Sequence, residues 1–213
     1  MNRIKALGAL GVLAIGVGVA LAQAPANMSF FVTSANPGKG GNLGGLAGAD
    51  AHCQTLAAAV GAGGKTWHAY LSTDTVNAKD RIGNGPWSNA KGERIAENVA
   101  DLHSANNKIS AATALNEKGV APNYLGGTPP APLATPLQHD ILTGTNEDGT
   151  KNAATCSNWT DGADATAMLG HADRIGRNPG VNSWNAIHPS QGCSMEKLVP
   201  TGGAGMFYCF ATN

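Results

Sequence analysis

The feature that most restricts how this 213-residue chain can fold is its set of four cysteines, Cys53, Cys156, Cys193 and Cys209. An N-terminal segment typical of an export signal precedes them, and an even number of cysteines in an oxidising compartment predicts two disulfide bonds. The sequence by itself allows three pairings. Zinc binding is the alternative, but it is disfavoured because no two of these cysteines have the close spacing of a C-x₂-C pair.

Residues 1–22 have the three regions of a secretory signal peptide. Arg3 and Lys5 supply positive charge, an uncharged apolar run extends from residue 6 to residue 20, and Ala20-Leu21-Ala22 has the small residues of a cleavage site. The run is short and interrupted by glycine for a stable membrane span of about 20 residues. We therefore predict a mature chain, 23–213, that is secreted or periplasmic, forms a single domain and has no membrane span.

Composition limits the classes of partner that the chain can have. Charged residues make up only 13% of it, aromatic residues 5%, and glycines number 29, so we expect long irregular segments around a modest core. The 14 basic residues balance the 14 acidic ones, and removal of the signal peptide leaves a small negative charge. Such a chain has no positive field that would attract nucleic acid or an acidic membrane surface.

The periodicity of apolar residues predicts a mixed α+β domain. The clearest helix begins at Asp50 and ends near Gly61, because apolar residues that include Cys53 recur at helical spacing between them. Residues 66–72 alternate as a strand does, with Trp67 on the side expected to face the core. Further strands are expected at 30–33, 165–171 and 206–211, a short strand leading into a helical turn at 95–103, and a proline-rich surface loop at 120–136.

Six segments, in the same order along the chain, resemble endostatin, the C-terminal domain of collagen. The first two are 44–54 (GGLAGADAHCQ) and 66–72 (TWHAYLS), which are similar to its first helix and the strand that follows. The other four are 139–149 (HDILTGTNEDG), 156–159 (CSNW), 167–170 (AMLG) and 208–213 (YCFATN).

This resemblance implies an endostatin-like domain of the C-type-lectin-like fold. That fold is an α+β arrangement of a mixed antiparallel sheet with one or two helices, long loops and two nested disulfides. Its first helix is bonded to its last strand and its second bond lies within that loop, which implies Cys53–Cys209 and Cys156–Cys193.

The resemblance also bears on cofactors. Endostatin holds zinc through a histidine-bearing N-terminal arm, and residues 23–35 contain no histidine. Trp184-Asn185-Ala186 resembles the Trp-Asn-Asp strand of calcium-dependent lectins, but alanine replaces the carboxylate. We therefore expect no cofactor, with calcium as the alternative.

Two His/Asp pairs are the candidates for catalytic chemistry. His139-Asp140 and His171-Ala172-Asp173 each place a carboxylate near an imidazole, as acid–base or metal chemistry requires. The sequence has no H-E-x-x-H motif, no G-x-S-x-G elbow and no phosphate-binding loop. An enzyme is therefore the alternative reading, as a secreted hydrolase that uses one of these pairs.

The segment between Cys156 and Cys193 is where we expect a ligand, because the long-loop region of the lectin-like fold lies between the inner cysteines. Polar residues concentrate there, and Trp184 offers a flat face for stacking if it is exposed, whereas a buried Trp184 would only pin the loop. We predict an exported, non-enzymatic module that binds a carbohydrate or another surface ligand, with a structural envelope protein as a further alternative. The predicted ligand-binding residues are Asn158, Asp161, His171, Asp173, Trp184, Asn185 and His188.

Overall fold

The computed structural model describes residues 27–125, 136–176 and 182–213. The predicted signal peptide and most of the proline-rich segment lie outside the described residues. In chain order the elements are β1 (Phe30–Val32), α1 (Gly45–Ala59), β2 (Trp67–Ala69), the 3₁₀ helix η1 (Ala78–Asp80), β3 (Trp87–Ser88), β4 (Arg94–Ala96), α2 (Val99–Leu102), β5 (Asp140–Leu142), α3 (Cys156–Trp159), β6 (Met168–His171), β7 (His188–Pro189), α4 (Met195–Leu198), the 3₁₀ helix η2 (Val199–Thr201) and β8 (Gly203–Ala211).

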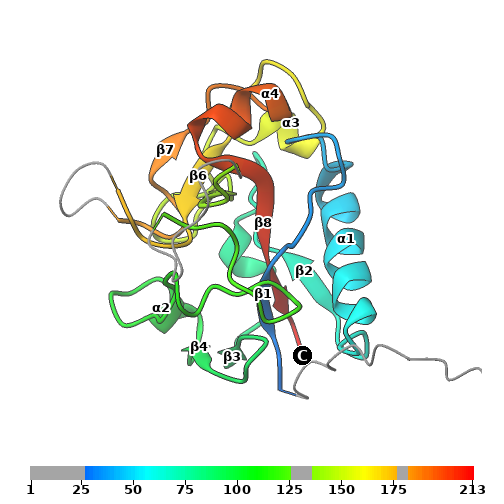
Figure 1. Cartoon of the computed structure of the whole chain (residues 1–213), viewed down its shortest axis with the longest axis vertical. Helices are drawn as coiled ribbons and strands as arrows, with labels where there is room; N and C mark the ends of the chain where they lie inside the picture. The colour runs from blue at the N-terminus through cyan, green and yellow to red at the C-terminus, as the bar shows by residue number, and fades with distance from the viewer. Residues whose placement is uncertain (1–26, 126–135, 177–181) are drawn as a thin grey trace, which may run out of the picture.

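The sheet is mixed and is organised around β8. This strand pairs antiparallel with β1 and β2 and parallel with β5, while β5 pairs antiparallel with β6 and β6 with β7. All nine residues of β8 are buried, as expected for a nearly continuous apolar strand in the interior of a sheet. Figure 1 shows β8 passing through the middle of the molecule, with α1 along one side and β3, β4 and α2 on the other.

Successive residues of β8 face two separate cores, because side chains alternate across a strand. Phe207 and Cys209 lie in the first core, between the sheet and α1. Tyr208 and Phe210 lie in the second core, with residues of β3, β4 and α2. The alternation predicted for residues 66–72 is confirmed, because Trp67 belongs to the first core, although only Trp67–Ala69 pairs as a strand.

Helix α1 begins at Gly45 and not at Asp50 as the sequence predicted. Gly44, with a left-handed φ of 77°, occupies the position before it, so the chain enters the helix through a glycine and needs no acidic cap. Asp50 lies within the helix, and its carboxylate accepts a hydrogen bond from the backbone N–H of Ala69 (2.8 Å) and pairs with Arg81 (2.7 Å).

Both disulfides join the pairs that the resemblance implies, Cys53 with Cys209 and Cys156 with Cys193. The first bond connects α1 to β8. The second connects α3 to the segment that precedes α4. All four cysteines are fully buried in the first core, so the two bonds stabilise a single packed cluster.

None of the helices in the described part of the chain is both long enough and apolar enough to cross a bilayer.

Candidate functional site

A pocket of about 880 Å³ opens beside β6, β7 and η2. Its wall is mainly apolar, and three histidine side chains border it. The described lining residues include the aliphatic Leu125, Leu137, Ile175, Ile187 and Val199 and the three histidines His139, His171 and His188.

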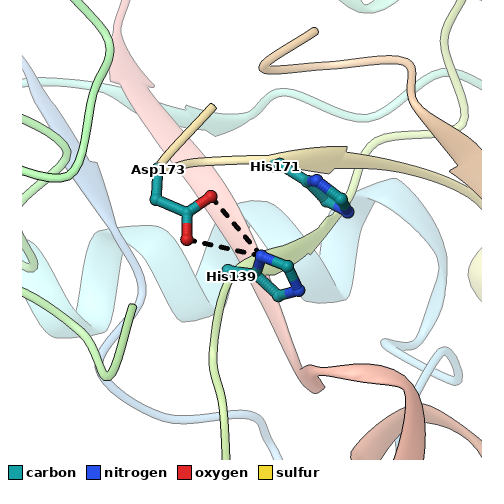
Figure 2. Close-up of side chains that lie close together, drawn as sticks. All are labelled: His139, His171 and Asp173. Carbon is teal, nitrogen blue, oxygen red and sulfur yellow. Dashed lines mark hydrogen bonds and ion pairs between the residues drawn. The ribbon is translucent and has the colours of Figure 1, made fainter. Parts of the chain in front are cut away.

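Strand pairing brings the histidines together from distant parts of the sequence. The β5–β6 register places Asp140 opposite His171, and His139 directly precedes β5. Strand β7 pairs with β6 and brings His188 alongside. Figure 2 shows the rings of His139 and His171 close together, with Asp173 reaching the His139 ring; the two ring centroids are 4.2 Å apart and the rings are stacked. The two predicted His/Asp pairs therefore form one cluster.

Asp140 is at the centre of this cluster and is fully buried. Its Oδ1 lies 3.0 Å from Nε2 of His171, 3.3 Å from Nε2 of His139 and 3.8 Å from Nε2 of His188. These contacts are close, but their geometry does not meet the criteria of a hydrogen bond. Within the described residues, neither carboxylate oxygen has a hydrogen-bond partner. A buried carboxylate without a donor is costly, and it is a feature that calls for an explanation.

The outer nitrogens of two imidazoles are held by backbone carbonyls. Nδ1 of His171 lies 2.5 Å from the oxygen of Ile175, and Nδ1 of His188 lies 3.0 Å from that of Pro189. Burial disfavours the charged imidazole of His171, but the contact with Asp140 and the Ile175 carbonyl outweigh it, so the pKa of His171 is raised.

Asp173, unlike Asp140, is well provided with donors. Its carboxylate accepts hydrogen bonds from the backbone N–H groups of Ile175 and Leu125, both at 3.0 Å, and lies 3.4 Å from Nδ1 of His139. Burial would raise its pKa, but the contact with His139 and these N–H groups together lower it. Asp173 therefore stays ionised and orients the His139 ring.

Gly202 makes room for that ring. Its φ of 110° is in the left-handed region, and a Cβ atom there would lie only 2.6 Å from Nε2 of His139. Its carbonyl also accepts the backbone N–H groups of His139 and Asp140. Glycine is thus required at this position both by the backbone conformation and by the approach of the imidazole.

Two overlapping donor sets in the described part of the chain could hold a metal ion. One consists of His139, His171 and Asp173, and the other of Asp140, His171 and His188. In each set the donor atoms lie within 4.8 Å of one another.

Trp184 and Asn185 do not form the exposed ligand face that the sequence predicted. Trp184 is only 3% exposed, and its ring lies in the second core against Tyr70 and Tyr208. The Asn185 side-chain amide is buried and donates to the Tyr70 hydroxyl and to the backbone oxygen of Asn146. The polar groups near Trp184 form hydrogen bonds inside the fold. Polar neighbours in the sequence therefore did not indicate that Trp184 is exposed.

Asn158 and Asp161 lie away from the pocket, in and after α3. The four residues of α3 have left-handed φ values of 49° to 66°, so this element is a left-handed turn. Asn158 accepts the backbone N–H of Asp74 (2.9 Å) and Asp161 accepts that of Ala163 (2.6 Å). Asn158 therefore joins the α3 turn to the segment at Asp74, and Asp161 supports its own loop.

Of the predicted ligand-binding residues, the structure brings His171, Asp173 and His188 into one cluster, and His171 and His188 of these line the pocket. Sequence reasoning noted His139 and Asp140 as a pair but left them out of the ligand face. It missed the aliphatic wall entirely, because those residues are scattered through loops and no periodicity connects them.

A family model described as protein of unknown function (DUF1554) matches residues 36–177, well over half of the chain. The matched region contains His139, Asp140, His171 and Asp173, whereas His188 lies beyond it. No curated protein matches the chain.

Proposed function

The chain belongs to the family described as protein of unknown function (DUF1554), and we propose that it is an exported, non-enzymatic binding domain whose ligand occupies the histidine-bordered pocket. The pocket carries this proposal. Its volume of about 880 Å³ falls in the range of small-molecule sites, and it combines apolar walls with a few convergent polar groups, as such sites do.

The lining favours a ligand with an aliphatic portion over a carbohydrate. Leu125, Ile175, Ile187 and Val199 supply branched aliphatic surface. Among the described lining residues there is no tryptophan, tyrosine or phenylalanine on which a sugar ring could stack. The histidines would then meet a polar or anionic group at one end of the ligand.

Export and fold are further parts of the proposal. The signal-peptide features of residues 1–22 support export, and so do two disulfides, which persist in oxidising compartments. N-terminal sequencing of the exported protein should begin at Gln23, and a chain that keeps Met1 would contradict this. The bond between the first helix and the last strand, in a mixed sheet, supports an endostatin-like, C-type-lectin-like fold.

A pair of matched tryptophan variants tests the pocket. Ile175 lines it and is 38% exposed, so Ile175→Trp should fill the pocket without unfolding the protein. Val120, 59% exposed, is not among the described lining residues, and Val120→Trp is the control. The oxidised mature chain would be titrated with medium-chain fatty acids and with neutral oligosaccharides by calorimetry.

We expect saturable binding of the fatty acids, weakened about tenfold or more by Ile175→Trp and unchanged by Val120→Trp. Binding of oligosaccharides alone, blocked by Ile175→Trp, would keep the pocket but reverse the ligand class. If nothing binds, or if both variants behave alike, the pocket is not a ligand site.

A secreted hydrolase is the second candidate, because both His/Asp pairs meet at the pocket. Under that alternative the protein would turn over a member of an ester, peptide or glycoside panel, and His171→Ala would abolish the turnover. A blank panel would rule the hydrolase out.

A further inference from the structure

We propose that Asp140, His171 and His188 bind a divalent transition-metal ion, such as Zn²⁺, beside the pocket. This inference builds on the proposed function, since it places a cation where the polar end of a ligand would lie. Its evidence is separate from the aliphatic wall: it rests on the hydrogen bonding of a buried carboxylate and two imidazoles.

Among the described residues, the Asp140 carboxylate lacks compensation for its burial. It is fully buried, and in the described part of the chain no donor satisfies either oxygen. An isolated buried carboxylate is retained in proteins when a cation or a set of donors compensates it. Asp173, by contrast, already has two backbone N–H donors, so the demand for a cation is specific to Asp140.

The second observation is the direction of the imidazole lone pairs. A carbonyl oxygen can only accept, so Nδ1 of His171 and Nδ1 of His188 must carry hydrogen. In the neutral rings, both Nε2 atoms are then unprotonated. They lie 3.2 Å from each other, and both approach Oδ1 of Asp140. When both rings are neutral in these tautomers, three atoms that carry lone pairs therefore converge on one point.

The separations of these atoms fit a tetrahedral metal. Metal bonds of about 2.0–2.1 Å to nitrogen and oxygen place neighbouring ligand atoms roughly 3.3 Å apart. The three observed separations are 3.0, 3.2 and 3.8 Å. In metal sites, a carbonyl group commonly accepts a hydrogen bond from the ring nitrogen that does not bind the metal, and so fixes the tautomer and orientation of the histidine. Nδ1 of His171 and Nδ1 of His188 have such carbonyl partners.

The contacts of Asp173 argue against the alternative donor set of His139, His171 and Asp173. Its oxygens already accept the backbone N–H groups of Leu125 and Ile175, and Nδ1 of His139 lies 3.4 Å from its carboxylate. We therefore assign His139 and Asp173 to a positioning role beside the metal site.

The donor types indicate which ion would bind. Two imidazole nitrogens and one carboxylate suit Zn²⁺ and its first-row neighbours, whereas Ca²⁺ takes six to eight oxygen ligands. The side chain of His188 is 41% exposed and borders the pocket. A site with three protein ligands at a pocket has a coordination position left for a ligand group or water, as in catalytic rather than structural zinc sites.

The test is metal binding by the untagged, oxidised mature chain after treatment with a chelator. Calorimetry with Zn²⁺ alone should give one saturable site, Co²⁺ should give a visible absorption band that Zn²⁺ abolishes, and Ca²⁺ should not bind. His188→Ala removes a half-exposed ligand and should weaken Zn²⁺ binding about 100-fold or more. His52→Ala, a histidine of α1 outside the cluster, is the matched control and should bind as the wild type does.

Asp140→Asn should abolish binding if it folds, and His188→Ala keeps the proposal testable if it does not. The proposal is overturned if the wild type shows no saturable Zn²⁺ site or if His188→Ala binds normally. Asp173→Asn should still bind Zn²⁺. If Asp173→Asn loses Zn²⁺ binding while His188→Ala binds normally, the metal belongs to the other donor set, His139, His171 and Asp173. Ile175→Trp, which blocks the pocket, should still bind Zn²⁺, so failure of the metal site and failure of the ligand pocket are distinguishable.

Discussion

The indole of Trp184 fills the centre of the second core. Its ring centroid lies 4.8 Å from that of Tyr70, 5.2 Å from Tyr208 and 5.8 Å from His103. Trp184→Ala would leave a large cavity among these rings, and we expect the free energy of unfolding to fall by about 3–5 kcal/mol in urea titrations. Val120→Ala, at an exposed position, should change it by less than about 0.5 kcal/mol. Normal stability of the Trp184 variant would contradict this structural role.

His103 makes a pH-dependent contribution to stability. The pKa of His103 is lowered, mainly because burial disfavours the charged imidazole. The Val99 carbonyl and Asp148 act to raise this pKa, and Lys79 acts to lower it further. The unfolded chain therefore takes up a proton more readily than the folded one. Stability is then lost as the pH falls through the unfolded value of about 6.5 and is kept above it.

We expect His103→Gln to show a shallower loss of unfolding free energy between about pH 7 and pH 5 than the wild type, measured by urea titration at each pH. His52→Gln, a histidine outside this core, is the control. Equal slopes for His103→Gln and the wild type would contradict the lowered pKa.

At the residue scale, sequence reasoning identified the chemistry but not the exposure. His171, Asp173 and His188 were predicted among the ligand-binding residues because imidazoles and carboxylates are recognisable by type, and the structure places them in one cluster with His139 and Asp140. Trp184 was misjudged because its neighbours are polar. Those neighbours satisfy buried groups, such as the Tyr70 hydroxyl that receives the Asn185 amide, and no local pattern reveals such bonds.

At the scale of elements, Asp50 connects α1 to the strand and loop beside it. Its carboxylate accepts the Ala69 N–H and pairs with Arg81, and Arg81 in turn donates to the Ala69 carbonyl. Asp50→Ala would leave a buried donor and a cation unpaired, so we expect about 2–3 kcal/mol of lost unfolding free energy. Glu97→Ala removes a partner of the exposed Arg94 and should cost less than about 1 kcal/mol. Similar losses for the two variants would show that the Asp50 contacts contribute little.

The elements themselves were largely predictable, and the pocket was not. The strands expected at 30–33, 66–72, 165–171 and 206–211 correspond to β1, β2, β6 and β8, since alternation and apolar runs are local signals. Strand β5 has only three residues, too few for a pattern of alternation to predict it. Its pairing with β6 places Asp140 opposite His171, and the pairing of β6 with β7 adds His188, so contacts between distant parts of the sequence assemble the three residues.

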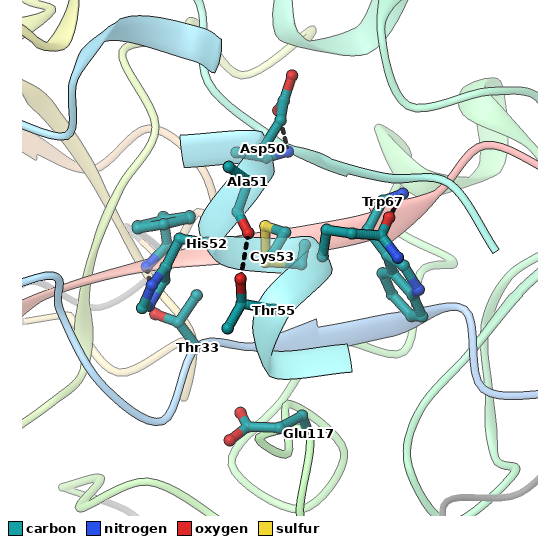
Figure 3. Close-up of a disulfide and its surroundings, with 12 residues drawn as sticks. Thr33, Asp50, Ala51, His52, Cys53, Thr55, Trp67 and Glu117 are labelled. Atoms are coloured by element: carbon teal, nitrogen blue, oxygen red, sulfur yellow. Dashed lines mark hydrogen bonds between the residues drawn. A yellow bond between two sulfur atoms is a disulfide. The ribbon is translucent and has the colours of Figure 1, made fainter. Parts of the chain in front are cut away.

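At the scale of the whole molecule, one strand divides the interior and one disulfide fixes it to the helix. Figure 3 shows Cys53 on the side of α1 that faces the sheet, near Trp67. The bond to Cys209 thus holds α1 against the middle of the sheet. The sequence alone left three pairings open, because spacing does not determine which cysteines meet in space. The pairing became predictable only through the resemblance of the first helix and last strand to a known fold.

The two disulfides should differ in how much they stabilise the fold. Cys53 and Cys209 are 156 residues apart and Cys156 and Cys193 are 37 apart, so loop closure predicts about 5 and about 4 kcal/mol respectively. All four cysteines are fully buried in one core, which makes the packing loss on replacement by alanine similar for each pair. Since small domains have roughly 5–15 kcal/mol of net stability, removing the longer bond should leave the fold close to its limit.

We therefore expect the double variant Cys53→Ala/Cys209→Ala to unfold at a lower urea concentration than Cys156→Ala/Cys193→Ala, and both below the oxidised wild type. The loss in the first variant should appear as one cooperative transition, because the bond joins α1 to the strand that both cores share. Equal or reversed midpoints would mean that loop length does not set the order, and that the turn at α3 contributes more than its short loop implies.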